Sequence, residues 1–314
     1  MDHQIESFLA FLAEERRLSA NTLSAYRNDL RQFEEYLSSR ADQLPLGGND
    51  GAGGPCIARA GRPQVGEFFL HLRENGYSPA TIARKMAAVK SIFRFLHRRG
   101  DIAANPTSQL GSPEVKKPLP RTISTGDVAT LIRQAKKRSS PEGLRDSAML
   151  HLLCATGMRV SELVSLDLDH VDPDGRRIVC TGRNSRRRVL PVDHRAIAAL
   201  DMYLRESRPR LLRGDQATPA LFLNHRGRRL TRQGFWLIMK SMARESGLRA
   251  EVTPHTLRHS FAAHRLKDGL ELDRLRELLG HANISTTQIY TQVRLEPPAP
   301  RPADGQAEAV GAKS

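Results

Sequence analysis

Residues 252–268 read VTPHTLRHSFAAHRLKD, and this stretch predicts a helix whose first turn carries charged and titratable side chains. Thr253 and Pro254 are typical of an N-cap followed by a proline at the first helical position. His255 and Arg258 then stand three residues apart, on one face of the helix. Because helix N-termini favour anions and a guanidinium offers a fork of donors suited to phosphate, the stretch predicts an anion site.

Three other side chains stand out from the helical background. In ATGMRVSEL a glycine interrupts two predicted helices, and Arg159 lies at the interruption, where a surface arginine at a helical corner is the ordinary explanation. His281 directly follows a helix-ending glycine, a place where histidine usually caps carbonyl groups. Tyr290 lies in STTQIYT on a short helix, where an amphipathic core residue is expected. Only together with His255 and Arg258 do these residues point to a reaction.

The segment RRIVCTGRNSRRRVLPV (176–192) reads as two β-branched runs around a polar turn, which predicts a hairpin; a further strand is expected at Leu221–Leu223. The hairpin's arginines can contact nucleic-acid phosphates and groove edges, or form an ordinary solvated face. The candidate DNA-binding residues are Arg176, Arg177, Arg186, Arg187 and Arg188.

The charge of the chain indicates a polyanionic partner. Its 314 residues include 49 Lys and Arg against 34 Asp and Glu, a net charge of +15. Neutralising phosphates releases counterions, so nucleic acid is the usual partner of such a chain, although high charge also serves solubility alone. The three cysteines exclude a disulfide framework, and the low aromatic content of 5% argues against a stacking groove for single strands. Without an apolar run of membrane length, a cytoplasmic, nucleoid-associated protein is expected.

Composition along the chain predicts two domains. Residues 1–106 form helical patterns, with a glycine-rich, flexible loop at about 45–62. A proline-rich linker follows at 107–122. A second domain of helices and a small sheet spans 123–296, and residues 297–314 have the composition of a disordered tail.

The order of ATGMRVSEL, the basic hairpin, HTLRHSFAAHRL and LLGHANISTTQIYT resembles that of the tyrosine site-specific recombinases of the phage-integrase superfamily, and most closely the bacterial Xer group. LSANTLSAYRNDL and GYSPATIARKMAAVKSIFRFL resemble that family's core-binding domain, so the resemblance covers about residues 3–295. It implies a mainly α fold with a small β-sheet. An N-terminal helical, SAM-like core-binding domain would precede a C-terminal mixed α/β catalytic domain.

The resemblance also implies roles for the conspicuous residues. Tyr290 would attack the scissile phosphorus of duplex DNA, leaving a 3′-phosphotyrosyl linkage and a free 5′-hydroxyl. His255 would accept and return the tyrosine proton, because an ordinary tyrosine has a pKa of about 10. Arg159 and Arg258 would clamp the non-bridging oxygens, and His281 would add a hydrogen bond to the phosphate. The reaction needs neither metal ion nor ATP, and the sequence has no phosphate-binding GxxxxGK[ST] loop.

Two positions depart from the family pattern. The family's hairpin usually reads G-K-G-N-K-E-R-x-V-P, with the first lysine as general acid for the leaving 5′ oxygen, whereas this chain has Arg183 there. An arginine holds charge but hardly donates a proton. Secondly, proline-rich sequence follows Glu296, where the Xer group continues with a helix that docks on a neighbouring protomer. This second departure argues against a housekeeping Xer role and leaves recombination as the expected activity.

Two other interpretations compete with the recombinase. A metal hydrolase would use His255, His259 and His264, but no glutamate follows His255 to act as base. A DNA-binding protein of the same fold that has lost strand transfer through the change at Arg183 is the stronger alternative.

The expected partner is double-stranded DNA at a specific site, clamped between the two domains. A homo- or hetero-tetramer on paired sites would exchange strands through a Holliday junction. This would serve chromosome-dimer resolution or mobile-element integration and excision, and it would involve neither a cofactor nor a membrane.

Overall fold

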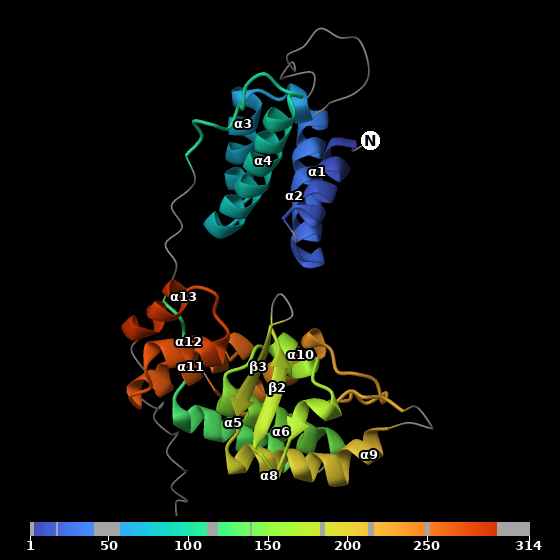
Figure 1. The fold of residues 1–314 in the computed structure, drawn as a ribbon, viewed down its shortest axis with the longest axis vertical. Coiled ribbons are helices and arrows are strands. Elements are labelled where there is room, and N and C mark those ends of the chain that lie inside the picture. Colours follow the sequence, from blue (N-terminus) through green and yellow to red (C-terminus); the bar gives the residue numbers. More distant parts are fainter. Residues whose placement is uncertain are drawn as a thin grey trace, which may run out of the picture. The chain divides into compact units, whose positions relative to one another are not determined.

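The computed structural model describes residues 3–16, 18–40, 57–111, 119–138, 140–182, 186–212, 217–248 and 252–293. The chain divides into two compact units, Met1–Lys117 and Pro118–Ser314, and the division falls inside the linker expected at 107–122. The expected fold class is confirmed, since helices dominate and the strands form one small sheet (Figure 1). Arg183, the tail 297–314 and most of the loop expected at 45–62 lie outside the described residues.

The first unit is helical. Its elements are α1 (His3–Glu14), α2 (Ala20–Ser39), a 3₁₀ turn (Ile57–Arg59), α3 (Arg62–Glu74) and α4 (Pro79–Arg99). Two helices begin with the same cap chemistry, because the hydroxyls of Ser19 and Ser78 accept from the amides of Thr22 and Thr81. The apolar faces of the four helices meet in one core that includes fully buried phenylalanines. These are Phe8, Phe33, Phe68 and Phe93.

The second unit contains the remaining elements. Its longer helices are α5 (Thr125–Lys137), α6 (Pro141–Thr156), α8 (His194–Met202), α10 (Arg232–Glu245), α11 (Pro254–Lys267) and α12 (Leu272–Leu279). Its short helices are α7 (Val160–Val164), the 3₁₀ turn Leu168–His170, the π-helical turn Tyr203–Ser207, α9 (Arg208–Leu211), α13 (Ser285–Gln288) and the 3₁₀ turn η5 (Ile289–Gln292). The central α6 contacts α5, α8 and α11, and α11 carries His255 and Arg258 (Figure 1).

The sheet of the second unit has three strands in the order β1-β2-β3, all antiparallel. They are β1 (Val171–Asp172), β2 (Arg177–Thr181) and β3 (Arg187–Pro191). β2 and β3 form the hairpin that the sequence predicted. The strand expected at Leu221–Leu223 is wrong: this segment forms isolated bridges, because its backbone groups pair with Leu166 and Leu230 instead of with a neighbouring strand.

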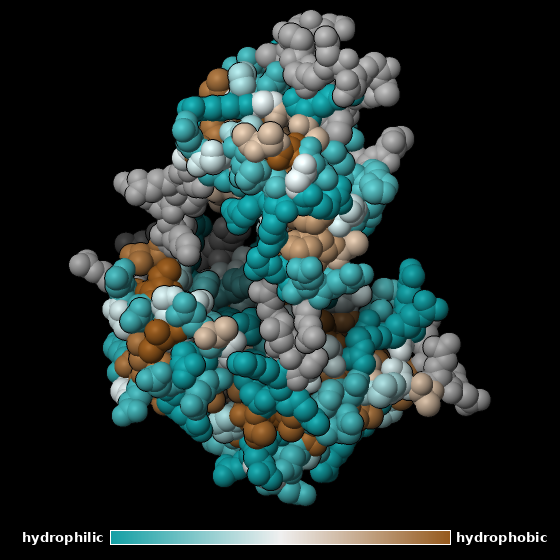
Figure 2. Space-filling view, turned by 45° about the horizontal axis from the view of Figure 1, so that its top comes forward, coloured by the Kyte–Doolittle hydropathy of each residue, from teal (hydrophilic) through white to brown (hydrophobic). Residues whose placement is uncertain are grey.

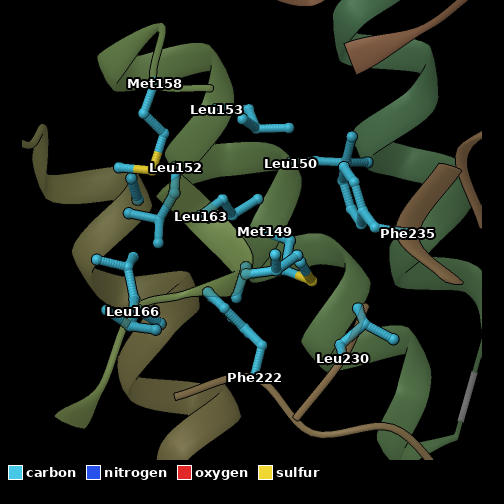
Figure 3. Close-up of a cluster of buried hydrophobic side chains, with 14 of the residues drawn as sticks. Met149, Leu150, Leu152, Leu153, Met158, Leu163, Leu166, Phe222, Leu230 and Phe235 are labelled. Atoms are coloured by element: carbon cyan, nitrogen blue, oxygen red, sulfur yellow. The ribbon is translucent and has the colours of Figure 1, made fainter. Parts of the chain in front are cut away.

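The hydrophobic core of the second unit surrounds α6. Met149, Leu152 and Leu153 of α6 are buried with Leu163 and Phe222, which come from distant parts of the sequence (Figure 3). The face of the molecule shown in Figure 2 is mostly hydrophilic, with scattered apolar patches. Within the described ranges, no helix combines the length and apolar character that crossing a membrane requires.

Candidate active site

The glycine between α6 and α7 fixes the position of Arg159. Gly157 has a φ of +60°, and a Cβ at this residue would lie 2.2 Å from the Phe261 ring on α11. Only glycine fits both the left-handed conformation and this close approach. The Arg258 guanidinium donates to the Gly157 carbonyl at 2.6 Å. The turn is therefore held against α11, and Arg159 and Arg258 lie close enough for their charges to repel.

A buried carboxylate holds two of the arginines. Glu162 is 4% exposed, and it accepts from the backbone amide and the guanidinium of Arg159 at 2.7 and 3.0 Å. Arg188 donates to both carboxylate oxygens at 2.8 and 2.7 Å and to the Leu278 carbonyl at 3.0 Å. Burial alone would raise the pKa of the Glu162 carboxyl, but these hydrogen bonds and charges lower it below its usual range. Glu162 is thus ionised, and it orients Arg159.

The hairpin arginines fall into two groups. Four of them are exposed: Arg176, Arg177, Arg186 and Arg187. Arg188 differs, because its side chain is 14% exposed and bound to Glu162. Its donors are already engaged within the protein. The four exposed arginines can be reached by a polyanion from solvent, although Arg177 also pairs with Asp172.

Arg258 and His281 form the next part of the site. Arg258 is 5% exposed and donates to the Leu279 carbonyl at 2.6 Å and to Nε2 of His281 at 3.0 Å. A guanidinium only donates, so Nε2 of His281 accepts and its Nδ1–H donates to the Thr287 hydroxyl at 2.9 Å. Burial and then repulsion from Arg159 lower the pKa of Arg258 to about 10. Burial, Arg258 and Arg159 lower the pKa of His281 to about 4, so this histidine is neutral at pH 7.

The aromatic ring of Tyr290 packs in a hydrophobic cluster, whereas its hydroxyl group contacts a residue of the candidate site. Tyr290 is 5% exposed and packs in a small cluster with Phe261, Leu275 and Leu279. Its hydroxyl oxygen lies 2.9 Å from Nδ1 of His259. Burial raises the pKa of the Tyr290 phenol, although the arginines nearby oppose this. The free protein therefore holds the hydroxyl protonated.

His255 lies apart from the tyrosine hydroxyl. It is exposed at the start of α11, and within the described chain it makes no hydrogen bond to Tyr290. It lines an open surface pocket of about 510 Å³. The other lining residues are Val160, Thr231, Arg232, Gln233, Trp236, Thr253 and Pro254.

The second unit thus gathers Arg159, Arg258, His281 and Tyr290 around one point, with His255 at the edge. Sequence reasoning missed Glu162 and His259, although the first follows Arg159 by one helical turn and the second is adjacent to Arg258. It considered His259 only as a metal ligand.

The metal-hydrolase interpretation requires the three histidines of α11 to gather. Of the residues that the structure describes, the group with suitable spacing for a metal is Asp167, Asp169 and His170, which belongs to another part of the unit. An Arg229 guanidinium already pairs with Asp167. Of the α11 histidines, His259 instead lies against the Tyr290 hydroxyl.

The buried histidines predict a pH-dependent stability. Burial lowers the pKa of His259 and His281 to about 4, and it also lowers the pKa of His151 and His264. An unfolded histidine titrates near pH 6.5, so between about pH 6.5 and 4 the unfolded chain binds protons that the folded chain does not. Stability is therefore expected to fall as the pH drops, by roughly 1 kcal/mol for each of His259 and His281 after allowing for partial exposure, and His151 and His264 act in the same direction.

This fall is measurable through Trp236, the one tryptophan of the chain, whose fluorescence reports unfolding of the second unit. Its midpoint temperature should be several degrees lower at about pH 5 than at about pH 7. An unchanged midpoint would contradict the neutral, buried state of these histidines.

Two family models match this chain, and each match falls within one of the two units. The model of the phage integrase family matches residues 121–296. The model of the phage integrase N-terminal SAM-like domain matches residues 5–46 and 50–100.

Curated relatives match nearly the whole chain. A tyrosine recombinase XerC of Roseiflexus castenholzii is 47% identical over 312 residues, which cover 97% of this chain and 95% of that protein. A tyrosine recombinase XerD of Listeria monocytogenes is 42% identical over 293 residues, covering 93% and 95%.

Solved structures share the fold. The pre-cleavage complex of the XerH recombinase with its difH substrate has a TM-score of 0.68 at 21% identity, covering 92% of each chain. The Tn1549 transposon integrase with transposon right-end DNA has a TM-score of 0.70 at 19% identity, covering 91% and 94%. With these matches added to the arginine, histidine and tyrosine cluster, the chain belongs to the phage integrase family and is a site-specific, DNA strand-transferring tyrosine recombinase.

Proposed function

We propose that this chain cuts duplex DNA through a covalent 3′-phosphotyrosyl bond at Tyr290 and rejoins it without an external energy source. The observation that carries the proposal is the convergence of one buried tyrosine hydroxyl, two arginines and a neutral histidine in the second unit. A covalent intermediate divides one exchange into two nearly isoenergetic steps. The free 5′-hydroxyl can then attack the same or another phosphotyrosyl bond.

The arginines stabilise the charge that grows on the phosphate. Arg159 and Arg258 would bind the non-bridging oxygens, which become more negative in the pentacovalent transition state. Arg258 now donates to the carbonyls of Gly157 and Leu279, so the phosphate oxygens take the place of neutral acceptors. His281 would donate a hydrogen bond to the phosphate once its Nε2 is released from Arg258 and carries the ring proton, with Nδ1 then accepting from the Thr287 hydroxyl. His255, exposed at the start of α11, would contact the phosphate from the solvent side.

DNA is the partner that both charge and relatives support. The +15 charge and the exposed hairpin arginines provide sequence-independent attraction to phosphates. The solved structures of similar fold include recombinases bound to DNA. We further propose that four protomers assemble on two DNA sites and exchange strands through a Holliday junction. The protein would reside on the nucleoid. Its biological use is chromosome-dimer resolution or mobile-element recombination.

Arg183 is expected to act on the leaving 5′ oxygen. Arg183→Lys should keep or raise cleavage, because a lysine, with a pKa of about 10.4, can stabilise the alkoxide and also donate a proton. Arg183→Ala should slow cleavage by roughly 10-fold or more, since the positive charge is lost. The measurement is the initial rate of covalent complex formation. Equal rates for Arg183→Ala and the wild-type chain would contradict this role.

The proposal is tested with a DNA site selected from a random duplex library by binding to the full chain, here called the selected site. A nicked suicide duplex carrying the selected site should yield a protein–DNA complex that survives boiling in detergent. Because the proposed chemistry uses side chains alone, a chelator should leave the yield unchanged. Binding without any covalent complex would overturn the proposal in favour of a DNA-binding protein that has lost strand transfer.

A further inference from the structure

We propose that His259 is a further catalytic residue, which accepts the hydroxyl proton of Tyr290 at its Nδ1 atom. The inference rests on the proposed function, in which Tyr290 attacks a DNA phosphorus atom. It is carried by the 2.9 Å contact between Nδ1 of His259 and the tyrosine oxygen. This distance suits direct proton transfer between a nucleophile and its base.

The direction of this hydrogen bond follows from burial. Tyr290 is 5% exposed, and the described residues offer its hydroxyl no partner other than His259. A buried O–H group needs an acceptor, so Nδ1 carries the lone pair and Nε2 carries the proton. Nε2 of His259 makes no hydrogen bond to the described residues. Among these residues, the side-chain nitrogen that is both buried and without a partner is Nε2 of His151, so Nε2 of His259 is exposed to solvent. A proton gained at Nδ1 therefore has an exit at Nε2.

His281 cannot take this role in the observed arrangement. Its Nε2 accepts from Arg258, and its Nδ1–H donates to the hydroxyl of Thr287, which is fully buried. Both ring nitrogens are therefore engaged, although the rings of His281 and Tyr290 are stacked with centroids 6.4 Å apart.

His255 is also less suitable as the proton acceptor. It is exposed, and its ring centroid lies 6.5 Å from that of His259, which separates it from the tyrosine. The His259 ring lies 5.6 Å from the Tyr290 ring. Of the three histidines, His259 is the one whose nitrogen faces the reacting oxygen.

The surroundings of His259 make its basicity depend on bound phosphate. The groups that face it are His255 and Arg258 on α11, Tyr290 on η5 and, beyond the tyrosine, His281. Burial, His255 and Arg258 lower the pKa of His259 to about 4 in the free protein. A phosphate bound by Arg258 offsets this repulsion, so the histidine accepts a proton more readily when the target is present.

The step balances without a further reagent. The bond between the tyrosine oxygen and phosphorus forms as the bond from phosphorus to the 5′ oxygen breaks. The phenol proton moves to Nδ1 of His259, and the leaving 5′ oxygen takes a proton from a water molecule, which departs as hydroxide. In the rejoining step the attacking 5′-hydroxyl gives its proton to hydroxide, and the proton on His259 returns to the departing oxygen of Tyr290.

The test compares His259→Asn with the wild-type chain on the selected site in a suicide duplex. Asparagine can still hydrogen-bond to the tyrosine but cannot hold its proton, so the cleavage rate should fall about 100-fold or more. His264→Asn, the same change on the same helix away from Tyr290, is the matched control and should cleave at the wild-type rate. A duplex with sulfur in place of the 5′ bridging oxygen distinguishes a defect in deprotonating Tyr290 from a defect in protonating the leaving group, because a thiolate leaves without an acid.

A slow His259→Asn variant on both the oxygen and the sulfur duplex supports the proposal. Rescue by sulfur would overturn it, because the defect would then lie at the leaving group, and so would a rate within about threefold of the wild type. If His259→Asn fails to fold by Trp236 fluorescence, His259→Ala replaces it, with imidazole added as the proton acceptor. Restored cleavage supports the proposal, and a folded variant that imidazole does not restore overturns it. Failure of the wild-type chain to cleave would instead overturn the proposed function itself.

Discussion

Tyr290→Phe is expected to abolish the covalent protein–DNA complex entirely while leaving the protein folded and able to bind DNA. The substitution removes one oxygen atom, which is the proposed nucleophile, and no other side chain can restore the bond to phosphorus. The aromatic ring stays in its cluster with Phe261 and Leu279, so the core is preserved. Stability should change by about 1 kcal/mol, the ordinary value of one hydrogen bond. The measurement is the yield of complex on the suicide duplex.

Tyr203→Phe provides the matched control. Tyr203 is also fully buried in the second unit, and its hydroxyl donates to the Leu221 carbonyl at 2.9 Å. The same hydroxyl accepts from the Leu223 amide at 3.2 Å, so its removal costs two hydrogen bonds, and neither involves a phosphate-binding side chain. The variant should therefore lose stability and still form the covalent complex. A complex formed by Tyr290→Phe would show that another residue attacks the DNA.

Glu162→Gln is expected to damage both stability and cleavage. It removes the charge that compensates Arg188, whose side chain is 14% exposed, and breaking a buried ion pair costs about 3–5 kcal/mol. The midpoint of Trp236 fluorescence should therefore fall by roughly 6–20 °C for a unit of this size. Arg159 loses its orienting partner as well, so the surviving folded protein should cleave at least about 10-fold more slowly.

Glu277→Gln is the control for this effect. Glu277 pairs with Arg274 across an exposed helix surface, with side chains 57% and 61% exposed. Such exposed pairs contribute about 0–1 kcal/mol, so this variant should melt and cleave like the wild type. Equal behaviour of the two glutamine variants would contradict the organising role of Glu162.

Local patterns in the sequence predicted the parts of the site that depend on neighbours along the chain. Thr253 and Pro254 start α11, and the spacing of His255 and Arg258 follows from helical geometry. The glycine before Arg159 breaks the helix as expected. The family resemblance then joined these pieces, because no local pattern tells which distant segments meet.

Contacts between distant segments required the structure. Arg188 was grouped with the other hairpin arginines, yet alternation along β3 turns it toward Glu162, 26 positions earlier in the chain. Likewise, periodicity placed Tyr290 in a core but could not tell which histidine its hydroxyl meets. His259 was visible as one of several histidines on α11, and only packing of η5 against that helix distinguishes it.

The contact between Gly157 and the Phe261 ring also bears on attempts to redirect the enzyme to new DNA targets. A methyl group at position 157 would overlap the ring and displace the segment that presents Arg159. Laboratory evolution should therefore leave this turn untouched and diversify exposed positions of α10, such as Leu237, whose side chain is 54% exposed. The range of variants that this recombinase tolerates is therefore limited by the close contact between the turn at Gly157 and α11, and not only by the need for the arginines themselves.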